Sequence, residues 1–159
     1  MARIESQRAI PLALIAAVLA LLAARVVVSQ METKKQGSGD DLVQWVPLDQ
    51  AQTLARESGR PILYDFTAAW CGPCHQLKAE VFRDERLAEM INDRFVPVRV
   101  VDRMREDGRN EPPVEALQQR FGVNGFPTIV VADGEGNARE RLEGYRGAAA
   151  FEQMMERFR

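Results

Sequence analysis

The residues best suited to chemistry stand together in one short motif. Cys71 and Cys74 are the only cysteines among 159 residues, and the only histidine, His75, follows them directly. A Cys-x-x-Cys-His segment can form and open a disulfide, contribute to a metal site, or attach c-type haem with the histidine as axial ligand. Structural zinc typically takes four ligands and this motif offers three, so we predict no metal here.

The residues between and before the cysteines favour disulfide exchange. Cys71 opens a predicted helix, whose unpaired N–H groups and positive dipole end stabilise a thiolate. Gly72 and Pro73 separate the cysteines, and proline fits the first helical turn because its missing N–H is not needed there. We predict that Cys71, exposed, is the nucleophile that attacks a substrate disulfide. Cys74, on the same helix face and more buried, would then resolve the mixed disulfide.

An acidic residue, Asp65, lies six positions before Cys71 within an apolar segment. Burial raises the pKa of a carboxyl group, which suits it to accept a proton near neutral pH. We therefore predict that Asp65 takes the proton from Cys74 during resolution. The alternative is a carboxylate that faces solvent at the end of a strand.

The pattern of apolar residues predicts the elements that hold this site. From Leu42 onward, strand and helix patterns alternate, and the right-handed crossover rule makes the first two long strands parallel. We predict strands at residues 61–66, 95–101, 128–132 and 138–142, with an edge strand at 43–46. We predict helices at 49–58 with Asp49 as N-cap, at 71–91 with a bend near 82–85, at 114–121, and in the segment that carries Phe151, Met154, Met155 and Phe158. Residues 102–113 are expected to form a loop. The fold class is α/β, a central mixed sheet with helices on both faces.

The first thirty residues differ in composition from the rest. Residues 9–28 are apolar except for Arg25, and a spanning helix needs about 20 apolar residues whereas a signal-peptide core has about 7–15. We predict that residues 1–29 hold a hydrophobic helix that anchors the chain in the inner membrane, with a cleaved signal sequence as the alternative. Residues 30–41 are predicted to be a linker and 42–159 the folded domain.

The net charge indicates which class of partner to expect, and the short N-terminal tail indicates on which side of the membrane the domain lies. The formal charge is −2 and the acidic and basic residues are mixed, so we expect no nucleic-acid partner. A short N-terminal tail usually stays in the cytoplasm. We therefore expect the folded domain to face the periplasm, or to be soluble there if the leader is removed.

Two separated segments resemble the thioredoxin family. Residues 65–74, DFTAAWCGPC, are similar to its active-site segment, and residues 121–128, FGVNGFPT, are similar to its segment with a cis-proline. The resemblance covers residues 42–159 and implies the thioredoxin fold. It also implies that Trp70 supports the active site, that Pro127 is cis and packs against the cysteines, and that the backbone of Phe126 pairs with substrate as an added strand.

Other segments resemble one branch of that family. Ala79 replaces a proline expected in cytosolic thioredoxins, and residues 79–84 and 95–98 are similar to membrane-associated thiol:disulfide interchange proteins. This implies an oxidoreductase that reduces or exchanges disulfides in extracytoplasmic proteins, is served by a thiol donor such as a membrane carrier, and needs no cofactor beyond its own disulfide. Two rivals remain, namely a haem protein that uses Cys71, Cys74 and His75, and a redox-inactive binding module of thioredoxin fold.

Overall fold

The computed structural model of the protein describes residues 41–158. The predicted membrane helix at 1–29 and nearly all of the predicted linker lie outside these residues. Within the described part, no helix is long and apolar enough to cross a membrane.

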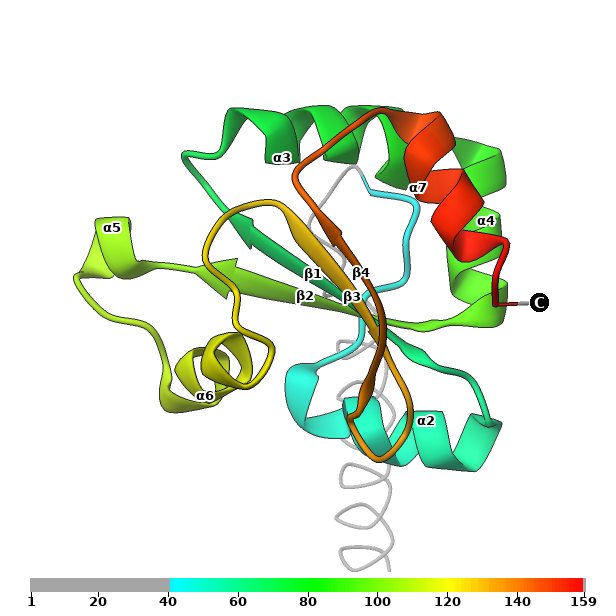
Figure 1. The fold of residues 1–159 in the computed structure, drawn as a ribbon, viewed down its shortest axis with the longest axis horizontal. Coiled ribbons are helices and arrows are strands. Elements are labelled where there is room, and N and C mark those ends of the chain that lie inside the picture. The colour runs from blue at the N-terminus through cyan, green and yellow to red at the C-terminus, as the bar shows by residue number, and fades with distance from the viewer. Residues whose placement is uncertain (1–40, 159) are drawn as a thin grey trace, which may run out of the picture. The chain divides into compact units, whose positions relative to one another are not determined.

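A four-stranded sheet forms the centre of the domain (Figure 1). Its strands are β1 (Ile62–Ala68), β2 (Val96–Asp102), β3 (Thr128–Ala132) and β4 (Ala138–Glu143), in the order β2-β1-β3-β4. The β1 and β2 strands are parallel, and the β1–β3 and β3–β4 pairs are antiparallel. The sheet is therefore mixed, as predicted. The two central strands, β1 and β3, consist mostly of apolar residues because both of their faces are covered.

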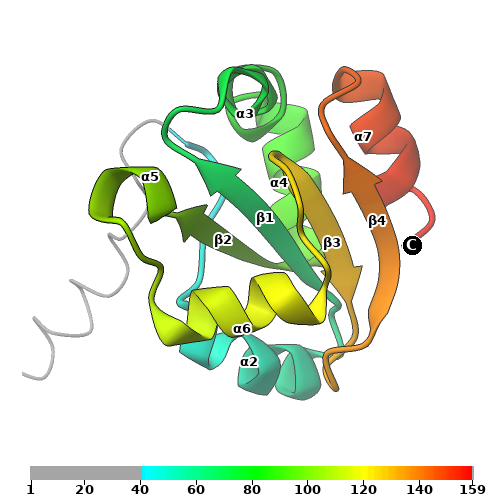
Figure 2. The same cartoon turned by 60° about the vertical axis from the view of Figure 1, so that its left-hand side comes forward.

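Helices cover both faces of the sheet (Figure 2). One face carries α2 (Ala51–Ser58) and α6 (Pro112–Arg120). The other carries α3 (Gly72–Leu77), the π-helical turn η2 (Lys78–Phe82), α4 (Glu85–Arg94) and α7 (Ala148–Met155). Because alternate side chains of a strand point to opposite faces, β1 sends Tyr64 and Phe66 towards α2 and α6, and it sends Leu63 and Asp65 towards the other face.

The predicted bend in the cysteine helix is confirmed. The chain leaves the helical path after η2, and the next helix, α4, begins beyond Asp84. The Asp84 carboxylate accepts a hydrogen bond from the backbone N–H of Leu87 at 2.9 Å, which satisfies one of the unpaired donors at the start of α4.

Three predictions about elements are wrong in detail. Residues 43–46 form no strand, because Gln44 N–H bonds to the Asn92 side chain while Val46 N–H bonds to the Pro97 carbonyl, so the segment runs across α4 before it reaches β2. Asp49 is not an N-cap, since the 3₁₀ turn η1 (Leu48–Gln50) precedes α2. The predicted loop at 102–113 contains a short helix, α5 (Met104–Asp107), and α6 already begins at Pro112.

Candidate active site

The two cysteines lie where β1 ends and α3 begins, and they are joined by a disulfide with an S–S distance of 2.05 Å. Cys71 is the N-cap of α3, and its Sγ accepts a hydrogen bond from the backbone N–H of Cys74 at 3.2 Å. Pro73 lies in the first turn of the helix. The sulfur of Cys71 thus faces the positive end of α3, an environment that favours a thiolate over a thiol once the disulfide is reduced.

The prediction that Cys71 is exposed is wrong for this disulfide form. Only 2% of Cys71 and 6% of Cys74 are exposed to solvent, so Cys74 is not the more buried of the two. The half-buried side chain of Phe126 packs against the cluster that the two cysteines form with Ala68. The disulfide is therefore largely shielded from solvent in this form.

The peptide bond between Phe126 and Pro127 is cis, as the resemblance to thioredoxins implies. Pro127 is buried and leads into β3. Its carbonyl accepts a hydrogen bond from the backbone N–H of Gly144 at 2.8 Å, and the Thr128 hydroxyl donates to the Gly125 carbonyl at the same distance. These bonds fix the loop that brings Phe126 to the cysteines.

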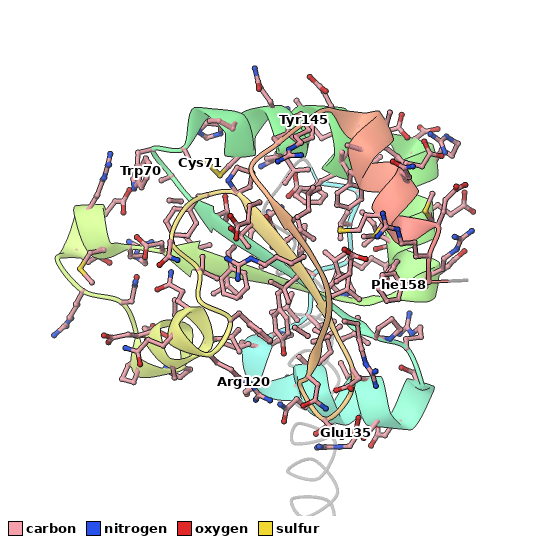
Figure 3. All side chains as sticks on the ribbon, viewed as in Figure 1. Trp70, Cys71, Arg120, Glu135, Tyr145 and Phe158 are labelled. Carbon is pink, nitrogen blue, oxygen red and sulfur yellow. A yellow bond between two sulfur atoms is a disulfide. The ribbon has the colours of Figure 1, made fainter. Side chains whose placement is uncertain are left out.

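Trp70 lies beside the disulfide with 44% of its surface exposed (Figure 3). Its ring meets that of Phe126 edge-on, with the ring centroids 5.9 Å apart. The guanidinium of Arg105 lies over the Trp70 ring, with its Cζ 3.5 Å from the ring centroid. The sequence analysis did not identify Arg105, because only the folding of residues 103–110 brings it to the tryptophan.

Asp65 is buried, with only 2% of its surface exposed, which rules out the solvent-facing alternative. It lines a cavity of about 190 Å³ together with Cys74, His75 and Lys78. Burial raises the pKa of Asp65 to about 6, although the Arg99 guanidinium opposes the shift. Its Oδ1 has no hydrogen-bond partner among residues 41–158. A carboxyl in this state can take up a proton near neutral pH.

Arg99 on β2 connects Asp65 to a second buried carboxylate, that of Asp41. Arg99 Nε donates to Asp65 Oδ2 at 3.2 Å, and Arg99 Nη1 donates to Asp41, which also pairs with Lys78 Nζ at 3.3 Å. The ring of Trp45 covers the guanidinium at 4.0 Å. The sequence analysis missed Arg99, whose place opposite Asp65 follows from the β1–β2 register.

His75 is exposed on α3, and its Nε2 lies 2.9 Å from the carbonyl oxygen of Ala69. The imidazole is thus tied to the loop that precedes the cysteines. Gly72 is exposed as well, with open space where a Cβ atom would be. Neither residue contributes to the packing over the disulfide.

A mixed sheet with a Cys-x-x-Cys disulfide at a helix N-terminus and a cis-proline beside it is the arrangement of a thiol-disulfide oxidoreductase of thioredoxin fold. A family model described as a thioredoxin-like domain matches residues 48–159. The chain belongs to this thioredoxin-like family. Membership favours disulfide exchange over haem attachment as the use of the Cys-x-x-Cys-His segment.

Individual relatives agree with the family assignment. The thiol:disulfide interchange protein DsbD of Salmonella typhi is 31% identical over 102 residues, which are 63% of this chain and 17% of that protein. A thioredoxin from Thermus thermophilus is 27% identical with a TM-score of 0.61, covering 72% of this chain and 85% of that one. The oxidised C-terminal domain of DsbD from Neisseria meningitidis is 26% identical with a TM-score of 0.52, covering 67% and 87%. The chain thus matches a small part of the length of full DsbD.

Proposed function

We propose that this protein is a thiol:disulfide interchange enzyme that reduces disulfides in extracytoplasmic proteins. The observation that carries the proposal is the Cys71–Cys74 disulfide at the start of α3, with the buried carboxyl of Asp65 lining the same cavity as Cys74. The Gly-Pro pair between the cysteines resembles that of the reducing members of the family, which supports a reductase over a primary oxidant.

The reaction begins with the reduced enzyme. The Cys71 thiolate, stabilised by the N-terminus of α3, attacks one sulfur of a client disulfide. A bond forms between Cys71 Sγ and that sulfur, and the other client sulfur leaves as a thiolate. Cys74 then attacks Cys71 Sγ and the first client sulfur departs. The client gains two electrons, and the enzyme is left with the Cys71–Cys74 disulfide.

Proton transfer accompanies the second step. In this proposal the Cys74 thiol loses its proton to the ionised carboxylate of Asp65, and the fact that both residues line one cavity supports this transfer. A pKa of about 6 leaves Asp65 largely ionised at neutral pH while keeping it basic enough for this transfer. The departing client thiolates take up protons from solvent.

The client would lie along the loop that carries the cis-proline. In this proposal the backbone of Phe126 pairs with an extended client segment, in the manner of a strand added to a sheet, and Trp70 and Pro127 border the segment. The exposed part of Trp70 offers apolar surface for such a client.

In this proposal the N-terminal residues determine where in the cell the protein lies. Residues 9–28 would anchor the chain in the inner membrane with residues 42–159 in the periplasm, and residues 30–41 would connect the two. A cleaved leader and a soluble periplasmic domain are the alternative. The similarity to DsbD supports an extracytoplasmic site and a membrane thiol carrier as electron donor.

Insulin reduction tests the activity. With dithiothreitol as electron donor, the wild-type chain should accelerate the precipitation of reduced insulin, and Cys71→Ser should abolish the acceleration because no nucleophile is left. The turbidity of the insulin solution measures the rate. Equal rates for the two proteins would remove the enzymatic claim and leave a binding module.

A further inference from the structure

Residues 103–110 form a short segment beside the active site, and hydrogen bonds to one carboxylate fix both of its ends. The buried carboxylate of Asp102, at the end of β2, accepts hydrogen bonds from the Met104 N–H at 3.1 Å, the Asn110 side chain at 2.6 Å and the Gln118 side chain at 2.9 Å. The two ends of the segment are therefore tied to the same carboxylate. The segment contains α5, which lies at the end of β2 near the end of β1 (Figure 2).

This fixed segment brings Arg105 to the active site. Its guanidinium lies on the face of Trp70, the Trp70 ring meets Phe126 edge-on, and Phe126 packs on the cysteines. We call the side chains of Arg105, Trp70 and Phe126 the aromatic stack. In Figure 3, Trp70 and Cys71 lie at the same end of β1, next to α5. The aromatic stack links the segment to the disulfide through direct contacts.

The aromatic stack affects how a thiol can reach the disulfide. An attacking thiolate must approach Cys71 Sγ in line with the bond to Cys74, yet only 2% of Cys71 is exposed. Because Phe126 packs against the cluster that contains both cysteines, we infer that its ring shifts before the sulfur atoms meet. A small thiol offers no surface to compensate the lost ring contacts, whereas a polypeptide can replace them with its own side chains.

We propose that Arg105 is a specificity-determining residue that holds Trp70 and Phe126 over the Cys71–Cys74 disulfide and so protects it from small thiols. Polypeptide partners open the aromatic stack by binding to it. The inference rests on the proposed disulfide exchange at this pair, and it adds a discrimination between protein partners and small thiols to that function.

Glutathione is a suitable small-thiol probe because its reaction with the disulfide is defined. One glutathione thiolate attacks Cys71 Sγ, a mixed disulfide forms, and Cys74 leaves as a thiolate. A second glutathione thiolate attacks the glutathione sulfur of the mixed disulfide and releases Cys71. Two glutathione molecules supply two electrons and become oxidised glutathione, and the two protons they lose are taken up by the cysteines.

The experiment measures the rate of this reduction on the full oxidised chain. Samples are quenched with acid, and free thiols are counted by the gel shift of a maleimide-linked polymer. Arg105→Ala should be reduced about two- to fivefold faster, as expected for loss of an exposed cation–π contact. Arg105→Lys should stay near the wild-type rate because lysine is also a cation. Arg109→Ala, which removes the same charge from the same segment, should not change the rate.

Combining Arg105→Ala with a Trp70→Ala variant shows whether Arg105 acts through Trp70. Trp70→Ala alone should accelerate reduction, and adding Arg105→Ala to it should bring no further gain. The proposal is overturned if Arg105→Ala matches the wild type or Arg109→Ala, or if it brings the same gain with and without Trp70. It is also overturned if the equilibrium constant with glutathione shifts enough to account for the faster rate.

The proposed function and this inference fail in different ways. If the wild-type chain reduces insulin but the Arg105 variants show unchanged rates with glutathione, only the inference is lost. If glutathione does not reduce the wild-type disulfide, and the wild-type dithiol does not reduce insulin, the proposed function is lost as well. Neutral dithiothreitol as a second small thiol separates shielding from charge effects on glutathione.

Discussion

At the scale of single residues, the environment of Asp65 determines its protonation state. It is buried in an ion pair with Arg99, and one of its oxygens has no hydrogen-bond partner among residues 41–158. Desolvation outweighs the attraction of Arg99, and the pKa of Asp65 rises from its ordinary value of 3.8 to about 6. The charged form is therefore less stable in the folded protein than in the unfolded chain.

This environment predicts the sign of a pH effect on stability. Between about pH 4 and pH 6 the folded chain keeps the Asp65 proton and the unfolded chain loses it, so the free energy of unfolding falls as pH rises. The total loss for this group is about 3 kcal/mol. Asp65→Asn cannot ionise and should lack this loss.

Denaturant unfolding of the oxidised protein at pH 4 and pH 7 measures the effect. The comparison of wild type with Asp65→Asn cancels the contributions of other groups, including Asp102, whose pKa is lowered. If both proteins lose the same stability between these pH values, the raised pKa of Asp65 is wrong.

At the scale of elements, the segment with α5 depends on one side chain. Burial favours the neutral form of Asp102, but hydrogen bonds from Gln118, Asn110 and Met104 favour the carboxylate more strongly and lower its pKa. These bonds, together with Arg103 N–H to the Asn110 side chain at 2.7 Å, give the segment its shape.

Asp102→Ala should therefore release the segment. The free energy of unfolding should fall by about 1–3 kcal/mol, because polar partners lose their acceptor in a partly buried site. Hydrogen exchange should accelerate more for the amides of residues 103–110 than for those of α4, which exchange through global unfolding and follow only the loss of overall stability. Uniform acceleration across both segments would show that Asp102 supports the whole domain and not this segment in particular.

At the scale of the whole molecule, the sequence predicted most of the fold and the chemical centre of the site. The strands, the helix break near residue 84 and the cysteine motif all follow from local patterns of apolar, capping and turn residues. Asp65 was identified because a single acid in an apolar strand is unusual. Local patterns therefore sufficed wherever one segment determines its own structure.

The remaining features depend on contacts between distant segments. Arg99 reaches Asp65 through strand register, and Arg105 reaches Trp70 through the folded 103–110 segment. Phe126, more than fifty positions after Cys71, packs against the cluster that contains both cysteines. None of these contacts has a local signature. The prediction of an edge strand at 43–46 is wrong for the same reason. Hydrogen bonds to α4 and β2 determine the path of that segment.

The proposed anchor makes a prediction for the 159-residue chain. When it is expressed in a Gram-negative bacterium, the protein should remain in the membrane fraction after an alkaline carbonate wash, because about 20 apolar residues suffice to span the bilayer. Intact mass spectrometry should find residues 1–29 still attached. A soluble periplasmic protein that lacks them would contradict the anchor and establish the cleaved leader.

The most direct test of disulfide exchange at Cys71 is a trapping experiment. Reduced Cys74→Ser is mixed with insulin, and non-reducing electrophoresis with mass spectrometry looks for a covalent adduct. Because Cys74 normally resolves the mixed disulfide, its loss should leave insulin attached to Cys71, and dithiothreitol should release it. The account predicts this adduct for Cys74→Ser and none for a chain in which Cys71 is also serine. The absence of an adduct with Cys74→Ser would contradict Cys71 as the nucleophile.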